Sequence, residues 1–355
     1  MIANIQALRA LAALLVVIVH LELLLAPVGI EPRHIMFGGG GVDLFFVISG
    51  FIMVYTTGQS WPSTGNFLLN RVIRIVPLYW LITLAVFAIA LAAPSLLSST
   101  EPRLDFLAKS LAFIPYVKAN GAVEPILFLG WTLNYEMFFY LFLGIGLTWK
   151  GRGLVAVALF FVALVILGAI LRASADFADP VARFYTAPIL LEFVFGMGIG
   201  AAFLAPRHAA IWTRTPRLLA VAMVAGGMAL LIGLPFAQPT LDRAIYTGIP
   251  AALVVTGVLM LERQGTIVRG RWVLLLGDAS YAIYLTHPFV TQAMTKLADT
   301  SGLLTPAARL SLVPVAYAGV IVTGVAVHLM IEKPMSRWLR QAIHLRRKSA
   351  PAGGM

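Results

Sequence analysis

Long apolar runs, separated by short polar gaps, follow one another along nearly the whole of this 355-residue chain. A run of about 20 mostly apolar residues is long enough to cross a bilayer as a helix. Ten runs meet this test, near residues 6–26, 39–57, 76–94, 126–147, 153–171, 187–205, 217–235, 245–262, 272–292 and 310–332. Because lipid leaves backbone polar groups to be bonded within the protein, we predict an all-α, polytopic transmembrane helical bundle of about ten spans.

The composition excludes several classes of protein. Only 12% of the residues are charged, whereas a soluble domain carries about a quarter. The absence of cysteine removes disulfides, thiolate zinc sites and a cysteine nucleophile, and no metal site is expected. The net charge of +11 is spread over the gaps between apolar runs instead of forming one patch, so no nucleic-acid partner is expected.

The distribution of Lys and Arg predicts the topology. If the N-terminus is cytoplasmic, the cytoplasmic segments hold sixteen of these residues and the opposite side nine, so both termini are expected inside. We expect residues 1–338 to form the membrane domain and 339–355 a cytoplasmic basic tail that lies on anionic membrane lipids. The amphipathic segment 103–118 is expected on the outer surface.

Ionisable residues inside the predicted spans indicate more than anchoring, because a charge at the centre of a span costs about 2.5–3.5 kcal/mol on insertion scales. This set comprises Arg9, His20, Glu22, Asp43, Glu136, Glu192, Asp278, His287, His328 and Glu332. Arg9 and His20 are eleven positions apart, which puts them on one helix face about 16 Å from each other. Glu192 and His328 are interpreted as structural.

Several polar residues in or next to the spans allow two interpretations. Asp43 follows four glycines and is either an N-cap carboxylate or a partner for a histidine or hydroxyl. Arg71 and Arg74 lie one turn apart and either anchor the topology or clamp a phosphate. Glu136 lies as deep as His20 and serves either proton transfer or a structural hydrogen bond.

The ninth run has a polar stripe. Tyr281, Tyr284 and His287 recur every third residue, and Pro288 opens the local backbone hydrogen bonding. The stripe is either a seam between helices or part of a site. At the end of the last run, Glu332 either pairs with a neighbouring cation or orients the arginines.

Sorted by depth, these residues form two levels. The cytoplasmic level holds Arg9, Arg71, Arg74 and Glu332, and the outer level holds His20, Asp43, Glu136 and His287. The first suits an anion and the second suits proton transfer. This arrangement is typical of a group-transfer enzyme with a phosphorylated donor.

Six segments carry a resemblance to a known family. They are LRALAALLVVIVH, GVDLFFVISGF, NRVIRIVPLYW, GWTLNYEMFFY, SYAIYLTHP and the final EKP, and they run in order from residue 5 to about 338. In sequence and order they resemble the acyltransferase type 3 family of membrane proteins, in particular its exopolysaccharide O-acetyltransferase-like branch.

The resemblance implies transfer of an acyl group from acyl-CoA, usually acetyl-CoA, to a glycan hydroxyl. His20 corresponds to the family's essential histidine, as general base or transient acyl carrier, and Arg9, Arg71 and Arg74 to its arginines. Glu136 or Asp43 is expected to orient the imidazole, while Tyr281, His287 and Glu332 are expected to contact substrate. A bacterial inner-membrane location, a polysaccharide acceptor and polysaccharide-biosynthesis proteins as partners also follow from the resemblance.

Two other functions fit charges within spans. A transporter or flippase of sugars or lipid-linked glycans also carries midplane charges, although no internal repeat is visible in this sequence. A catalytically silent subunit of a polysaccharide synthase is the other alternative. Only an enzyme would move label from acetyl-CoA to polysaccharide.

Overall fold

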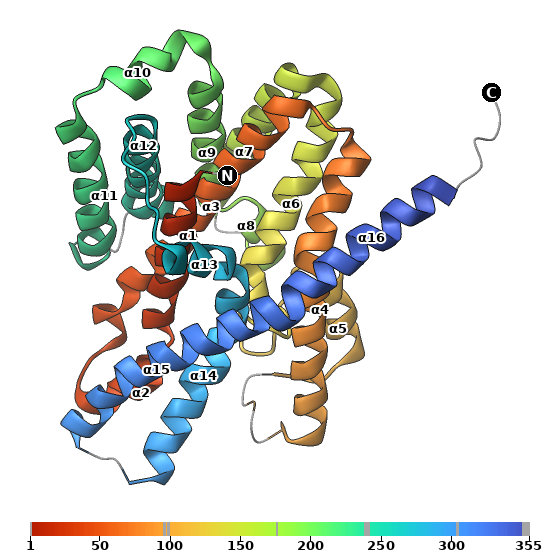
Figure 1. Cartoon of the computed structure of the whole chain (residues 1–355). Coiled ribbons are helices and arrows are strands. Elements are labelled where there is room, and N and C mark those ends of the chain that lie inside the picture. Colours follow the sequence, from red (N-terminus) through yellow and green to blue (C-terminus); the bar gives the residue numbers. More distant parts are fainter. Residues whose placement is uncertain are drawn as a thin grey trace.

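The computed structural model describes residues 2–94, 97, 100–174, 177–237, 242–302 and 305–349, with side chains described up to residue 343. These residues form a helical bundle (Figure 1), and their one isolated β-bridge joins Val117 and Val123. The α-helices are α1 (Ala3–Val19), α2 (Glu22–Leu25), α3 (Gly40–Ser60), α4 (Thr64–Ala92), α5 (Leu104–Leu111), α6 (Gly130–Gly146), α7 (Lys150–Arg172), α8 (Pro180–Tyr185), α9 (Leu190–Leu204), α10 (Ala209–Arg214), α11 (Arg217–Ala237), α12 (Ile249–Arg263), α13 (Arg271–Asp278), α14 (Ser280–Thr300), α15 (Pro306–Val327) and α16 (Lys333–Ser349). The short 3₁₀ and π segments are η1 (Ala26–Val28), η2 (Pro32–His34), η3 (Met36–Gly39), η5 (Leu147–Trp149), η6 (Pro206–His208), η7 (Ala244–Gly248) and η8 (His328–Glu332).

Seven helical stretches in the described part of the chain are long and apolar enough to cross a membrane, or up to nine if each of two bent pairs counts as one. One of the seven, Gly130–Arg172, contains both α6 and α7. These two helices lie antiparallel, with Phe138 against Phe161 and Phe142 against Phe160. The predicted all-helical, multi-span architecture is confirmed, while the exact number of spans and the side of each terminus stay predictions.

The first predicted span, near 6–26, is broken rather than continuous. Helix α1 ends at Val19 after a run of β-branched residues, and the following α2–η1 segment is bent by 49° from it. His20 occupies the break, where its backbone N–H donates to the carbonyl oxygen of Val17. His20 is therefore a helix-end residue and not, as predicted, a position within one straight helix.

The ninth predicted span, near 272–292, is also broken, and it extends further than expected. Helices α13 and α14 meet at Ala279 with a bend of 76°, and α14 continues to Thr300. Helix α13 lies across α1, where Gly277 is essential to the contact because a Cβ there would lie 2.1 Å from the carbonyl oxygen of Gln6. The Gln6 amide also donates a hydrogen bond to Asp278. The break therefore places Asp278 beside Gln6 in the N-terminal half of α1.

Helix α3 is the central element of the bundle. Of its most apolar window, 78% is buried within the protein, against 17% for α11. Glycines allow its neighbours to approach closely: a Cβ on Gly50 would lie 2.1 Å from the carbonyl oxygen of Phe193 on α9, and one on Gly41 would lie 2.3 Å from that of Ala12 on α1. Small residues of this kind let helix backbones pack in a membrane, where apolar burial alone does not drive association.

Two π-helical turns interrupt the helices. The η7 turn precedes Pro250 on α12, and the η8 turn precedes Pro334 on α16. A proline lacks the N–H that would continue the α-helical pattern, so the wider turn accommodates it. Helix α16 begins within the predicted membrane domain, so the expected boundary after residue 338 falls inside one helix.

The segment expected on the outer surface, 103–118, is helical over only its first half. Helix α5 ends at Leu111, and the chain then turns at Phe113, which has a φ of 57°. The Phe113 ring stacks on Tyr79 of α4 at 4.8 Å. The segment thus packs compactly against the middle of α4, where Tyr79 and Trp80 donate to its backbone carbonyl oxygens.

Candidate active site

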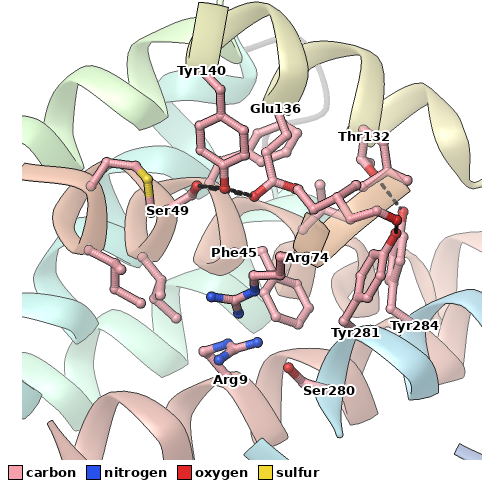
Figure 2. Close-up of a pocket in the computed structure, with 17 residues that line it drawn as sticks. Arg9, Phe45, Ser49, Arg74, Thr132, Glu136, Tyr140, Ser280, Tyr281 and Tyr284 are labelled. Atoms are coloured by element: carbon pink, nitrogen blue, oxygen red, sulfur yellow. Dashed lines mark hydrogen bonds between the residues drawn. The ribbon is translucent and has the colours of Figure 1, made fainter. Parts of the chain in front are cut away.

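An open cavity lies between α1, α3, α4, α6 and the α13–α14 break, with about 750 Å³ of empty space that includes open solvent (Figure 2). Its polar lining residues are Arg9, Ser49, Arg74, Thr132, Glu136, Tyr140, Ser280, Tyr281 and Tyr284. Aliphatic and phenylalanine side chains, most of them from α3, form the rest of its wall. A long cavity with apolar walls and a few polar groups is the usual form of a small-molecule site.

Two arginines mark one end of the cavity. The guanidinium groups of Arg9 and Arg74 lie near each other there, with Ser280 beside them (Figure 2). Arg9 is buried and donates to Gln6 Oε1 at 2.8 Å, and Gln6 in turn donates to Asp278. This relay holds one guanidinium in place and leaves further N–H groups to face the cavity.

The predicted arginine pair on α4 is divided between two places. Arg74 lines the cavity, whereas Arg71 lies behind it, with its guanidinium 5.7 Å from the ring centre of Phe67 and 5.9 Å from that of Tyr140. Contacts of this length are typical of cation–π interactions. The structure therefore brings Arg74 and Arg9 together and gives Arg71 a position that supports Tyr140.

Glu136 projects into the cavity from α6, but its partners are hydroxyl groups and not a histidine. Tyr140, one turn further along α6, donates to its carboxylate, and Ser49 of α3 donates to the same Oε1 atom at 3.2 Å. Ser49 and Tyr140 also lie 3.1 Å apart. The expectation that Glu136 orients His20 is thus replaced by a carboxylate–hydroxyl network inside the cavity.

Two tyrosines of the predicted stripe line the cavity. Tyr281 donates to the carbonyl oxygen of Ile75 at 2.8 Å. The Tyr284 hydroxyl lies 2.9 Å from Thr132 Oγ1 and 3.2 Å from the carbonyl oxygen of Leu129. Tyr284 and Thr132 therefore close the part of the cavity that lies nearest to the start of α6.

The two histidines lie together behind Tyr284. The ring centres of His20 and His287 are 4.8 Å apart, and the ring of Tyr284 is 5.9 Å from that of His287. Phe128 contacts His20 edge-on at 5.3 Å. The structure thus brings together two residues that are 267 positions apart in the sequence, and it puts them next to the cavity rather than among its lining residues.

The hydrogen bond of His287 defines its tautomer. Its Nδ1 atom lies 3.3 Å from the carbonyl oxygen of Ile283, which can only accept, so Nδ1 carries the proton. Nε2 then presents a lone pair, and it is buried with no hydrogen-bond partner among the described residues. His287 is therefore able to accept a hydrogen bond from a group placed between it and His20, or from His20 itself.

Two predicted site residues have other partners. Asp43 is fully buried and accepts two 2.8 Å bonds from the guanidinium of Arg243, so it is not the partner of His20. Glu332 lies 2.8 Å from Nδ1 of His328 in the η8 turn, so its partner is this histidine and not the neighbouring Lys333 or Arg337. The interpretation of His328 as a structural hydrogen-bonding residue agrees with this contact.

Several polar residues of the site were not singled out from the sequence. They are uncharged residues in segments where the prediction relied on the charged and titratable ones: Ser49, Thr132, Tyr140, Ser280 and Gln6. Tyr140 could have been found, because it is one helical turn from Glu136. Arg243 could not have been found, because Asp43, its partner, is 200 residues away in the sequence. Arg243 also lies between two apolar runs, where a cation is common and does not indicate a site.

Comparison with known proteins identifies the family. A family model described as an acyltransferase domain matches residues 2–330. The chain is 39% identical over 312 residues to the exopolysaccharide production protein ExoZ of Rhizobium meliloti (strain 1021), covering 86% of this chain and 92% of that protein. It is 28% identical over 290 residues to nodulation protein 10 of Rhizobium leguminosarum bv. viciae, covering 73% and 74%. No solved structure matches. The predicted resemblance is confirmed, and the chain is an acyltransferase that belongs to the acyltransferase type 3 family of multi-pass membrane proteins.

Proposed function

We propose that this protein is an inner-membrane O-acyltransferase that moves an acyl group, acetyl in the simplest case, from acyl-CoA to a hydroxyl of an exported polysaccharide. The observation that carries the proposal is a pair of guanidinium groups at one end of the cavity and a pair of imidazoles next to the cavity, behind Tyr284. The kinship with a protein named for exopolysaccharide production supports a polysaccharide as the acceptor.

The cavity suits a donor with an anionic head and a thin arm. Arg9 and Arg74 supply charge-assisted donors for phosphate oxygens, and the apolar wall from α3 suits the uncharged arm of CoA. Ser280 is fully buried, and its hydroxyl has no hydrogen-bond partner among the described residues. It is therefore available to a polar group of the donor.

The chemical step assigns His20 the role of base. The acceptor oxygen attacks the thioester carbonyl carbon while its proton passes to the His20 imidazole, and the C–S bond breaks. The proton then moves from the imidazolium to the CoA sulfur, so the step balances as ester plus free thiol. The alternative, in which the imidazole first takes the acyl group and the hydroxyl then displaces it, uses the same residues.

His287 is the proposed orienting partner of His20. Its Nε2 lone pair is buried beside the His20 ring, so it can accept an N–H bond from His20 and stabilise the imidazolium that forms. The carbonyl oxygen of Ile283 holds the His287 ring from the other side. In this proposal, an imidazole performs the task that the sequence assigned to a carboxylate.

The decisive experiment uses the purified full chain in lipid nanodiscs with labelled acetyl-CoA and de-acetylated exopolysaccharide. The wild-type protein is expected to transfer label. His20→Ala should lower transfer by at least about 10²–10⁴-fold, the usual contribution of a positioned base. His34→Ala is the matched control, because His34 is an exposed loop residue. Equal transfer by His20→Ala and wild type would disprove the proposed role. In sealed proteoliposomes, label that crosses the membrane without joining the glycan would instead indicate a transporter.

A further inference from the structure

An ion pair between the fully buried Asp43 of α3 and the half-buried Arg243 ties together two segments of the chain. The Nε and Nη2 atoms of Arg243 each donate to one oxygen of Asp43 at 2.8 Å. Thr247 Oγ1 donates to the same carboxylate at 2.6 Å, and Arg243 Nη2 also lies 3.3 Å from the carbonyl oxygen of Gly39. The pair therefore fastens η7 to the junction between η3 and α3.

The η3 segment, which the ion pair holds in place, packs against the C-terminal turn of α1. A Cβ on Gly38 would lie 2.5 Å from the carbonyl oxygen of Leu15 and 3.0 Å from Cγ2 of Val19, the last residue of α1. Only a glycine backbone can lie so close, so η3 packs directly on the last turn of α1. His20 follows that turn immediately and takes its position from it.

The contacts of the pair argue against a role in the chemistry itself. Neither Asp43 nor Arg243 lines the cavity. The charge of Asp43 is matched by Arg243, and the fully buried carboxyl of Glu192 lies against the same carboxylate. The cost of taking the Asp43 carboxylate out of water offsets much of its attraction to Arg243, so the pair is poorly explained as a stabilising device. A better-supported use of buried ion pairs is to select one arrangement of neighbouring elements.

We propose that Asp43 and Arg243 are positioning residues that hold the last turn of α1, and with it His20, against His287. This inference rests on the proposed role of His20. Arg9 lies ten residues before Val19, in the N-terminal half of α1, so the arginine end of the cavity should not depend on the pair. The sequence predicted that the Asp43 carboxylate orients the imidazole directly. In this proposal, the carboxylate acts only by binding Arg243.

The first test removes both charges of the ion pair together. The double variant Asp43→Leu/Arg243→Met should lower kcat by about 10- to 100-fold, because a displacement of about 1 Å at a catalytic group costs roughly that much. KM for acetyl-CoA should stay unchanged. Arg172→Ala is the matched control, because Arg172 is a half-buried arginine that bonds Thr186 on the far side of α7. A wild-type kcat in the double variant would overturn the proposal.

The second test restores the link in a different chemical form. The chain has no cysteine, so Asp43→Cys and Thr247→Cys, added to Arg243→Met, create the protein's only thiol pair. Bridging these thiols, by oxidation or by a short bifunctional thiosulfonate, should recover most of the lost kcat, and reduction should abolish the recovery. A bridged protein that stays impaired would show that the carboxylate acts chemically, which contradicts a positioning role.

A third measurement does not depend on acyl transfer. Diethyl pyrocarbonate modifies imidazoles, and peptide mass spectrometry reports the rate for each histidine in one digest. Loss of the ion pair should change the modification rate of His20 severalfold and leave that of His34 unchanged. An unchanged His20 rate would overturn the positioning role even if wild-type transfer is observed. A wild-type protein that transfers no label while its His20 rate responds to the pair would refute only the proposed function.

Discussion

His20 and His287 face each other with their ring centres 4.8 Å apart, although they come from opposite ends of the chain. Each lies at an irregular point of its helix: His20 at the end of α1 and His287 next to Pro288 within α14. The irregularities allow two polar rings to meet where regular helices would pack apolar side chains. This contact supports an imidazole pair as the centre of the proposed reaction.

The role of His287 can be separated from its bulk. His287→Phe should keep the ring contact with His20 but lose the Nε2 acceptor, and we expect kcat to fall by about 10- to 100-fold, as for a misoriented catalytic group. His287→Gln can present an oxygen acceptor and should retain more activity than the phenylalanine variant. Single-turnover rates of label transfer measure the difference. Equal rates for the two variants would contradict the acceptor role.

The two arginines of α4 should behave differently. Arg74→Gln removes a charge that faces the cavity, and a charge-assisted hydrogen bond of about 1.5–3 kcal/mol corresponds to a rise in KM for acetyl-CoA of roughly 10- to 100-fold. Arg71→Gln should raise KM less, because Arg71 lies behind Tyr140. Initial rates over a range of acetyl-CoA concentrations test this, with the exposed Arg152→Gln as control. A larger effect for Arg71 would contradict the division of the pair.

Glu136 should matter through its charge as well as its hydrogen bonds. Glu136→Gln keeps a carbonyl oxygen for Tyr140 and Ser49 but removes a negative charge from a cavity that contains two arginines. We expect the variant to bind the anionic donor more tightly than the wild-type protein does. The difference in Kd between the two proteins should be smaller at high salt, because salt screens charges that solvent reaches. Isothermal titration with CoA at two ionic strengths measures both effects. Weaker CoA binding in this variant would mean that Glu136 does not act by charge.

The close packing of α3 on α9 can be tested by two glycines on one helix. A Cβ on Gly196 would lie 2.1 Å from the carbonyl oxygen of Val47, whereas no atom lies within 4 Å of one on Gly198. Gly196→Ala should therefore destabilise the protein by about 1–3 kcal/mol, the usual cost of overpacking. Gly198→Ala should be neutral or stabilising by up to about 1 kcal/mol, because alanine favours the helix. Thermal unfolding in detergent compares the two, and equal shifts would contradict the packing.

The all-helical class and the family could be predicted from the sequence because both depend on local information. An apolar run of span length is helical in lipid whatever surrounds it, since its backbone groups have no other partners. The six sequence blocks predicted the family, which the match over residues 2–330 confirms. The grouping of Arg9 with Arg74 was also within reach, because span boundaries place both at one level.

The partners of the buried charges were decided only by the tertiary structure. Spacing along one helix gives the depth and face of His20, Asp43 and Glu136, but not which helix lies opposite. Breaks near His20 and at Ala279 turned the chain, and His20 lies against His287. Helix packing brought Arg243 to Asp43 and Ser49 of α3 to Glu136. A buried polar group bonds to whichever group the packing brings near, and that packing follows from glycine contacts and helix breaks spread over the whole chain.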